Sequence, residues 1–491
     1  MIIMKILKER TRLIFTEYNE AEKRYLEDLV ASMDNVYMYD DPDGMKLGLP
    51  TGMENSVRRV FTRAQFTDNS SQFWDYARIQ PVQHNAQPRN QLQHDFINFV
   101  LENVTKRQKL AGILGPGTGK TFMAIYSSIR AGLRTLIIAP TSGIKQQWLD
   151  TITGMFQVPS ERAKFVSKPS DLININHDFV IVSQASLAVL NKKYDLEKIL
   201  KAGKFGIKIV DEAQMWFKNI VCVDACSNIA NNWYLTGTFG RSGETENRIF
   251  QEMFGDLAIF REKMKAPTVF DPRPGNIYGM KPYIHTKMVW TSSGLDRETI
   301  KKVTSSMRYS EREGKWMRFG VSVPMWASLV VPSDYSMTPF LKAILTTVKR
   351  AEAEVTYGKT LVLGPTVNNA EVVAYYLRKI LPNKKIGTYH SRNSKEENAK
   401  NKAECDILVS TDKSAGTGFD VKGLAKLILF SQFKSWILAE QIMFRNRRRD
   451  DQKDCYFWDI VDAQIPQLRS WANVRADVYK KKGKTFKVID L

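Results

Sequence analysis

The sequence predicts an α/β protein with two parallel sheets in tandem, each covered by helices on both faces. Three observations support this fold class. Short apolar runs rich in β-branched residues alternate with helical segments between residues 110 and 239. The same alternation returns between residues 359 and 430. Polar or charged residues follow directly after several of these runs, as they do at the carboxyl ends of parallel strands.

The individual elements are expected from runs of apolar residues and from capping signals. In the first block we expect a helix over His94–Asn103, a strand that ends at Gly115, and strands at Arg134–Pro140, Phe179–Ser183, Phe205–Val210 and Tyr234–Phe239. In the second block we expect helices over Pro339–Val355 and Asn368–Ile380, a helix from near Trp436, and strands at Lys359–Gly364, Asp406–Ser410 and Ala425–Phe430, with a further strand leading into Tyr389.

The composition indicates a folded protein with a polyanionic partner. The chain has 72 Lys and Arg against 52 Asp and Glu, for a net charge of +20, and the basic residues are dispersed along it. Nucleic acid is therefore favoured over a membrane surface, with plain solvated charge as the alternative. We expect no membrane span and no targeting segment. The four cysteines do not form a disulfide framework, so we expect buried, reduced thiols in a cytoplasmic protein.

A glycine-rich run at residues 115–121, GPGTGKT, lies between an apolar segment and a helix-forming one. Glycines let the backbone point its N–H groups at a polyphosphate, and the helix that follows adds its positive end. Lys120 would contact the β- and γ-phosphates, and the Thr121 hydroxyl would ligate Mg²⁺. The alternative is a glycine-rich turn without a ligand. The nucleotide-binding residues expected here are Gly117, Thr118, Gly119, Lys120 and Thr121.

Two acidic residues follow the strand FGIKIV, about ninety residues after the glycine-rich run. Asp211 would hold Mg²⁺, and Glu212 would polarise the attacking water. The alternative for the pair is the capping of a helix. An ATP-hydrolysing site is the better interpretation, because a phosphate-binding loop needs such carboxylates at a neighbouring strand end.

Arginines are concentrated in the late run QIMFRNRRR, residues 441–449. Arg445 and Arg448 would reach the γ-phosphate from a second lobe when the two lobes meet across a cleft. Arg447 would contact the phosphate backbone of a nucleic acid. The alternative for the whole run is a basic patch for phosphate backbones.

The ordered set GPGTGKT, IAPT, VDEAQ, LTGT, STDKSAGTGFD and QIMFRNRRR resembles the motifs of superfamily 2 helicases and translocases. The resemblance implies two tandem RecA-like lobes that use ATP and Mg²⁺. It also implies adenine recognition by Gln93, with Gln91 as the rival. The remaining roles that it implies are strand contacts by Thr141 and Thr411, lobe coupling by Thr236 and Thr238, and nucleotide contacts by Gly418, Asp420 and Gln441.

Two positions depart from the usual motifs of this superfamily. Phe444 stands where it usually has Gly, and Leu114 stands where it often has Ala or Gly. Both changes bear on local backbone geometry. Of the two arginines, Arg445 is therefore less firmly assigned than Arg448.

Within the superfamily, the chain most resembles the UvsW-type branched-DNA helicases of tailed phages. The similar features are the small amino-terminal α/β module, the DEAQ motif, the ending after CYFWDIVD and the closing run RADVYKKKGKTFKVIDL. We expect four parts: an amino-terminal nucleic-acid-binding accessory domain over 1–85, an ATP-binding lobe over 86–257, a basic inter-lobe insertion over 258–335, and a second lobe with a carboxyl-terminal extension over 336–491.

The expected function is that of an ATP-dependent DNA helicase or translocase on forked or branched DNA, in replication, recombination or repair. Its expected partners are single-stranded and branched duplex DNA, and a single-strand-binding or recombination protein, in the host cytoplasm if the source is a phage. Three alternatives stay open: an RNA helicase or viral transcription-release factor, a double-strand translocase that does not separate strands, and a scaffold with an inactive ATPase. Intact Lys120, Asp211, Glu212 and Arg448 argue against the last.

Overall fold

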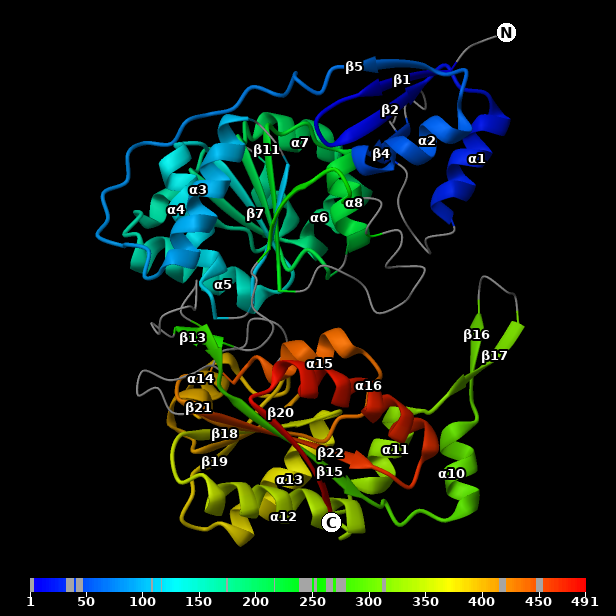
Figure 1. Cartoon of the computed structure of the whole chain (residues 1–491), viewed down its shortest axis with the longest axis vertical. Coiled ribbons are helices and arrows are strands. Elements are labelled where there is room, and N and C mark those ends of the chain that lie inside the picture. The colour runs from blue at the N-terminus through cyan, green and yellow to red at the C-terminus, as the bar shows by residue number, and fades with distance from the viewer. Residues whose placement is uncertain are drawn as a thin grey trace. The chain divides into compact units, whose positions relative to one another are not determined.

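The chain divides into two compact units, residues 1–263 and 264–491. Figure 1 shows them in a computed structural model. The structure describes residues 4–31, 39–40, 47–106, 109–115, 117–173, 175–215, 217–237, 250, 254–261, 268–270, 280–310, 315–414, 421–446 and 454–491. Each unit is described separately below.

The first unit begins with a small sheet of its own, in the order β3-β4-β2-β1-β5. Its strands are β1 (Lys5–Lys8), β2 (Arg12–Thr16), β3 (Tyr39–Asp40), β4 (Leu47–Pro50) and β5 (Gln65–Asp68). They are antiparallel except for the parallel pair β1 and β5. Helix α1 (Glu20–Ala31) begins with a reciprocal cap, because Asn19 and Glu22 each accept the backbone N–H of the other. A 3₁₀ turn (Thr51–Met53) and helix α2 (Glu54–Val60) complete the expected α/β module.

A seven-stranded parallel sheet forms the rest of this unit, in the order β12-β6-β11-β10-β7-β9-β8. The strands are β6 (Leu110–Ile113), β7 (Thr135–Ala139), β8 (Ala163–Phe165), β9 (Phe179–Ser183), β10 (Ile207–Asp211), β11 (Asn231–Thr236) and β12 (Ala258–Arg261). Five of them are fully buried along their length, as continuous apolar runs in a two-sided parallel sheet should be. The predicted parallel sheet is confirmed.

Helices flank this sheet on both sides (Figure 1). They are α3 (Gln91–Thr105), α4 (Lys120–Ala131), α5 (Ser142–Asp150), α6 (Gln184–Lys193), α7 (Leu196–Ala202) and α8 (Phe217–Ala225), with short turns at Thr151–Met155, Ser160–Arg162 and Pro169–Leu172. Helix α3 begins at Gln91, earlier than the expected His94, because the Asn90 side chain caps it by accepting the Gln93 N–H.

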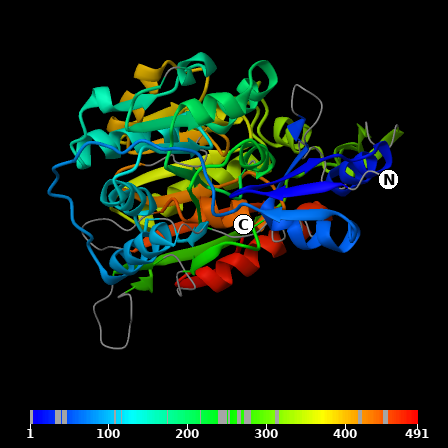
Figure 2. The same ribbon diagram turned by 90° about the horizontal axis from the view of Figure 1, so that it is seen from above.

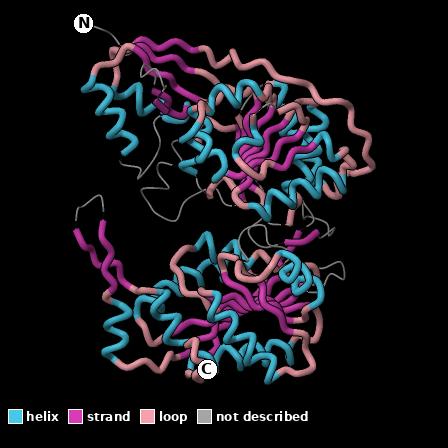
Figure 3. Tube along the Cα trace, turned by 180° about the vertical axis from the view of Figure 1, so that it is seen from behind, coloured by secondary structure: helices cyan, strands magenta, loops and turns pink. Residues whose placement is uncertain are grey.

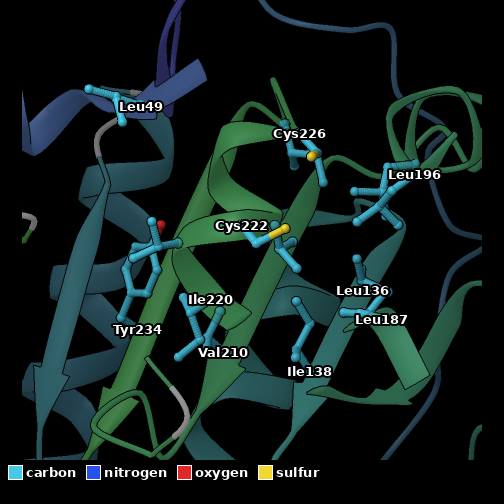
Figure 4. Close-up of a cluster of buried hydrophobic side chains, with 14 of the residues drawn as sticks. Leu49, Leu136, Ile138, Leu187, Leu196, Val210, Ile220, Cys222, Cys226 and Tyr234 are labelled. Atoms are coloured by element: carbon cyan, nitrogen blue, oxygen red, sulfur yellow. The ribbon is translucent and has the colours of Figure 1, made fainter. Parts of the chain in front are cut away.

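The amino-terminal module and the parallel sheet share one hydrophobic core. Figure 4 shows Leu49 of the module in the same cluster as Ile220, Cys222 and Tyr234 of the larger sheet and its helices. An extended segment, residues 69–90, then crosses the unit from β5 to α3 (Figure 2). It is fastened by backbone hydrogen bonds such as Trp74 N–H to Asn228 O and Ala77 N–H to Lys204 O. The module is therefore a fixed part of the first unit.

The second unit holds another seven-stranded parallel sheet, in the order β19-β20-β18-β21-β22-β15-β23. Its strands are β15 (Ile284–Thr291), β18 (Lys359–Gly364), β19 (Ile386–Tyr389), β20 (Ile407–Thr411), β21 (Leu424–Leu429), β22 (Cys455–Asp462) and β23 (Thr485–Asp490). Its helices are α10 (Arg297–Thr304), α11 (Val323–Val330), α12 (Pro339–Glu354), α13 (Val367–Ile380), α14 (Lys395–Glu404), α15 (Trp436–Met443) and α16 (Pro466–Lys482).

Apolar side chains cover both faces of this second sheet. Along β18, Val362 packs in the cluster that contains α12 and α13, whereas Leu361 and Leu363 pack in the cluster that contains α15 and α16. Successive side chains of a strand point to opposite faces, so helices lie on both sides. Figure 3 shows helices around the larger sheet of each unit. Two tandem parallel-sheet lobes are therefore confirmed.

The interval expected to be an insertion, residues 258–335, contributes to both sheets. It supplies β12 at the edge of the first sheet and β15 between β22 and β23 of the second. It also supplies two-stranded hairpins, β13 (Thr268–Phe270) with β14 (Met280–Pro282) and β16 (Ser306–Ser310) with β17 (Lys315–Gly320). The four-part division of the chain stays a prediction.

The four cysteines are buried, as expected. Among the described helices, none has the length and apolar character needed to cross a membrane.

Candidate functional site

The glycine-rich run forms a tight loop between β6 and α4. Gly117 and Gly119 have φ angles of +80° and +92°, in the left-handed region that favours glycine. A side chain at position 119 would also collide with Gln93, since an added Cβ would lie 2.6 Å from its Nε2. The Thr118 hydroxyl donates to the Gly115 carbonyl over 2.7 Å, which closes the turn. Helix α4 then starts at Lys120, so its amino-terminal N–H groups face the loop.

Gln93 fixes this loop from helix α3. Its Nε2 donates to the Thr118 carbonyl over 2.9 Å, and its Oε1 accepts the Arg89 N–H over 2.8 Å. Gln93 is buried, with 3% of its surface exposed. The rival Gln91 is exposed and donates instead to Asp95, one turn along its own helix. Of the two glutamines, Gln93 is therefore the one that contacts the loop.

Asp211 and Glu212 lie at the carboxyl end of β10, two strands from β6 in the same sheet. Burial, together with the adjacent charge of Glu212, raises the pKa of Asp211 to about 6. Glu212 has a φ of +49°, a left-handed conformation that costs a non-glycine residue on the order of 1 to 3 kcal/mol. Such strain is typical of functional positions.

A series of polar contacts joins the glycine-rich loop, through the VDEAQ motif, to the LTGT motif. Lys120 Nζ lies 3.2 Å from Glu212 Oε1, and Gln214 Nε2 donates to Glu212 Oε2 over 2.7 Å. The Thr236 hydroxyl, at the end of β11, donates to Gln214 Oε1. Gln214 and Thr236 are almost fully buried, with 1% and 0% of their surfaces exposed. The structure therefore brings three motifs of the first lobe into one network.

The donor set at Asp211 fits a magnesium ion. Oδ1 of Asp211 accepts the Glu212 N–H over 2.9 Å, and Oδ2 accepts the Trp148 indole N–H over 2.8 Å. A carboxylate has about four lone-pair sites, so each oxygen keeps one for a water or a metal. The Thr121 hydroxyl, in the first turn of α4, would be the second oxygen donor. Hard oxygen ligands and substrate phosphates are what Mg²⁺ prefers, rather than a cage of protein side chains. The described residues contain no cluster of three His, Cys, Asp or Glu side chains that could hold a metal ion.

Thr141 lies at the start of α5, after β7. Its side chain caps the helix by accepting the Ile144 N–H over 3.4 Å. The position is the carboxyl end of a central strand, the same edge of the sheet that carries Asp211.

Three expected residues of the second lobe lie within the described part of the chain. Thr411 ends β20, and its hydroxyl accepts the Ser414 N–H over 2.9 Å. Gln441 lies in α15 and Arg445 just after it, both partly exposed. Burial raises the pKa of Asp412, and the charge of Arg445 counteracts that rise. Arg445 is thus near the carboxyl end of β20, in the same region of the unit as Thr411.

The remaining expected residues lie outside the described part of the chain. They are Thr238, Gly418, Asp420, Arg447 and Arg448. Their roles stay predictions.

Two residues at the site had no role predicted from the sequence. Gln214 belongs to the DEAQ motif, and its buried bridge between Glu212 and Thr236 requires the parallel pairing of β10 and β11. Trp148 lies in α5, and its contact with Asp211 joins residues 63 positions apart. The signal for Trp148 in the sequence was its place seven residues after Thr141, in a helix whose other apolar side chains are only Ile144 and Leu149.

Comparison with known proteins agrees with this site. Residues 87–233, which contain the loop and the Asp211–Glu212 pair, match the family model of the type III restriction enzyme res subunit. A protein of Invertebrate iridescent virus 6 named helicase 161L is 23% identical over 386 residues, which cover 75% of each chain. A protein of Acanthamoeba polyphaga mimivirus named ATP-dependent RNA helicase L396 is 20% identical over 379 residues. That alignment covers 75% of this chain and 63% of the mimivirus protein, so the chain spans less than two thirds of that relative.

Solved structures share the fold. A fragment of an HsdR subunit of a type I restriction enzyme from Vibrio vulnificus aligns with a TM-score of 0.53 at 16% identity, over 83% of this chain and 70% of that one. Dbp5 of S. cerevisiae, bound to RNA and ADP BeF3, aligns with a TM-score of 0.52 at 12% identity, over 90% and 94% of the chains. T4 UvsW aligns at 13% identity over both full chains, but its TM-score of 0.35 is too low to bear on the subfamily.

Three features are typical of nucleic-acid-dependent ATPases. They are the motif order, the two RecA-like lobes, and the network around Lys120 and Glu212. With the sequence likenesses, they support an ATP-hydrolysing helicase or translocase that resembles those of superfamily 2.

Proposed function

We propose that the chain is an ATP-driven DNA motor that acts on forked or branched DNA in replication, recombination or repair. The observation that carries the choice of DNA is the match of residues 87–233 to a restriction-enzyme subunit, since the name refers to DNA restriction. The matched segment is the part of the chain that holds the phosphate-binding loop and both site carboxylates. The resemblance of the motif layout to UvsW-type branched-DNA helicases supports the same substrate class.

In this proposal ATP and Mg²⁺ bind to the loop of the first lobe. Lys120 contacts the β- and γ-phosphates, Asp211 and Thr121 hold the metal, and Glu212 orients the attacking water. Arg445 and Arg448 of the second lobe approach the γ-phosphate when the lobes close, with Gly418, Asp420 and Gln441 as further nucleotide contacts. Hydrolysis then releases the lobes.

Translocation follows from alternating contacts with one strand. Thr141 in the first lobe and Thr411 with Arg447 in the second contact the phosphate backbone in turn, so each cycle moves the protein along the strand. Contacts of this kind read no base sequence. The net charge of +20 supports strong, salt-sensitive binding of a polyanion.

An RNA helicase or a viral transcription-release factor is the second candidate. It is favoured by the name of the mimivirus relative and by the RNA bound to Dbp5. The same ATP site would serve either strand. A double-strand translocase that does not separate strands is a further variant of the motor.

The test is a panel of substrates of equal length: single-stranded DNA, duplex DNA, forked DNA, a four-way DNA junction, and the corresponding RNA duplexes. We expect ATP turnover to be stimulated most by the DNA substrates, with unwinding or branch migration of the fork and the junction. The Lys120→Ala variant is the control for contaminating ATPases. Equal or better unwinding of RNA would overturn the choice of DNA, and stimulation by duplex DNA without strand separation would favour the double-strand translocase.

A further inference from the structure

Helix α5 makes a direct contact with the carboxylate expected to hold the metal. The Trp148 side chain is fully buried, and its Nε1–H donates to Asp211 Oδ2 over 2.8 Å. Asp211 itself is 5% exposed. A hydrogen bond to a buried carboxylate oxygen fixes the direction of that oxygen's remaining lone pair, and so fixes where a bound water or metal must lie.

The same helix is capped by Thr141, the residue expected to contact a nucleic-acid strand. Thr141 and Trp148 are seven residues apart, so they lie on about the same side of the helix and roughly 10 Å apart along it. A shift or rotation of α5 that follows from contact at its first turn therefore moves the indole as well. The two ends of one short helix touch the strand-contacting edge and the metal-holding carboxylate.

The segment after α5 contacts the nucleotide-binding loop's own helix. Residues Thr151–Met155 form a π-helical turn, a local irregularity that is often found at functional sites. It leads to Phe156, which is fully buried and stacks on Phe122 of α4, with ring centroids 5.4 Å apart. Phe122 lies two residues after Lys120. Residues 141–156 therefore contact both Asp211 and α4, the helix that begins with Lys120.

We propose that Trp148 is a positioning residue, which holds the Asp211 carboxylate for Mg²⁺ and transmits nucleic-acid contact at α5 to the ATP site. This inference rests on the proposed function, since Thr141 contacts a strand only in a nucleic-acid motor. The step is conformational and involves no new chemistry. The competing interpretation is that Trp148 only fills the core. A similar tryptophan–aspartate hydrogen bond in the second unit provides a control for this interpretation.

Trp326 of α11 makes an equivalent buried contact in the second unit. Its Nε1–H donates to Asp462 Oδ2, also over 2.8 Å, and its side chain is fully buried. Trp326→Phe therefore removes the same donor from the same kind of acceptor, in a unit that contains no expected metal ligand. It is a matched control for the loss of an indole hydrogen bond.

The experiment compares the full-length wild type, Trp148→Phe and Trp326→Phe. The first measurement is the dissociation constant of Mn²⁺, a probe for Mg²⁺, in the presence of ADP. Binding is monitored as the decrease of the electron paramagnetic resonance signal of free Mn²⁺. Loss of an outer-shell partner weakens metal binding by about ten- to a hundredfold, so we expect a Mn²⁺ dissociation constant at least about tenfold higher for Trp148→Phe. We expect no change for Trp326→Phe.

The second measurement is the effect of single-stranded DNA on the same Mn²⁺ dissociation constant. Binding linkage is reciprocal, so DNA that stimulates turnover through α5 should also tighten metal binding in the wild type. Trp148→Phe should lose this tightening, and Trp326→Phe should keep it. Replacing Trp148 by benzothienylalanine keeps the shape of the ring system without the N–H donor, so it serves if the Phe variant does not fold.

Two outcomes separate this inference from the proposed function. Mn²⁺ binding by Trp148→Phe that equals the wild type, or a shift shared equally with Trp326→Phe, overturns the positioning role even when the wild type is stimulated by DNA. A wild type whose turnover is stimulated by neither DNA nor RNA overturns the proposed function itself.

Discussion

Lys120 and Glu212 form an ion pair in the first lobe, with Nζ and Oε1 3.2 Å apart and both side chains largely buried. The pair joins the phosphate-binding loop to the residue expected to orient water. Glu212→Gln keeps the side-chain shape but removes the charge. We expect ATP turnover to fall by about 10²- to 10⁴-fold, the usual contribution of a general base.

Nucleotide affinity should respond to this change in the opposite direction. The Glu212→Gln variant no longer places a negative charge beside Lys120 and the phosphates, so ATP should bind at least as tightly as in the wild type. Turnover is measured by phosphate release and affinity by titration with a fluorescent ATP analogue. Glu102→Gln, at an exposed pair with Lys106, is the control and should change neither. Turnover of Glu212→Gln at the wild-type rate would refute the assignment.

Substitutions of Gln93 and Gln91 can be compared directly, because both residues lie at the start of α3. Gln93 contacts the loop at the Thr118 carbonyl, whereas Gln91 donates to Asp95. Gln93→Ala should raise the KM for ATP by roughly tenfold, which corresponds to about 1.4 kcal/mol, the size of one hydrogen bond. It should also reduce the preference for ATP over GTP, whereas Gln91→Ala should leave both unchanged. The reverse pattern would assign adenine recognition to Gln91.

The pKa of Asp211 is raised to about 6, which predicts that its ionised carboxylate lowers the free energy of unfolding. The carboxyl group is protonated more readily in the folded than in the unfolded state, so the folded state loses stability as the pH rises from about 4 through 6. Asp211→Asn removes that cost. In EDTA at pH 8 its free energy of unfolding should exceed that of the wild type by on the order of 1 to 3 kcal/mol.

This gain should shrink towards zero as the pH falls to about 4, where the wild-type carboxyl group is protonated in the folded state. The measurement is urea unfolding at both pH values. The variant should have no ATPase activity at any pH, because it lacks the metal-holding charge. A variant less stable than the wild type at pH 8 would show that burial of the charge is fully compensated.

Arg12 fastens the amino-terminal module to the lobe. Its guanidinium donates to both oxygens of Glu197 over 2.9 Å and also pairs with Glu9. Arg12→Met leaves Glu197 without this partner and should lower the free energy of unfolding by about 2 kcal/mol, less than for a fully buried pair because Glu197 is 27% exposed. Lys198→Met, at an exposed pair on the same helix, should stay within about 0.5 kcal/mol of the wild type. Equal effects of the two would mean that Arg12 does not hold the module.

Lys301 and Lys302 of α10 test whether the basic interval 258–335 binds DNA. Both side chains are exposed, and Lys302 pairs with Glu298 on its own helix. Changing both to Glu should weaken DNA binding and lower the slope of log affinity against log salt by about 0.9 for each phosphate that the protein no longer neutralises. ATP binding without DNA should not change. Lys106→Glu is the control. An unchanged salt slope for the double variant would show that Lys301 and Lys302 are solvated surface charges that do not contact DNA.

Much of this site could be predicted from the sequence, because its motifs are local. Lys120 and Asp211 each belong to a short run whose chemistry depends on neighbours in the chain. The choice between Gln91 and Gln93 could not be made in the same way. Both lie at the start of one helix, and only the packing of α3 against the loop buries one of them.

The contacts that the sequence did not reveal are between residues far apart in the chain. Trp148 reaches Asp211 because β7 pairs directly with β10, which brings the following helix over the end of the neighbouring strand. Strand order cannot be read from apolar periodicity alone. The same reason explains why the sequence alone assigns β15 to an insertion, whereas it pairs between β22 and β23, more than 160 residues later in the chain.

The hydrophobic cluster shared by the amino-terminal module and the first lobe limits how this chain can evolve. Phe15 and Leu49 of the module pack in one core with Val210 and Tyr234 of the lobe. A recombination breakpoint near residue 85 would give the lobe a foreign partner for that surface. Substitutions on one side of the cluster should therefore couple energetically to those on the other.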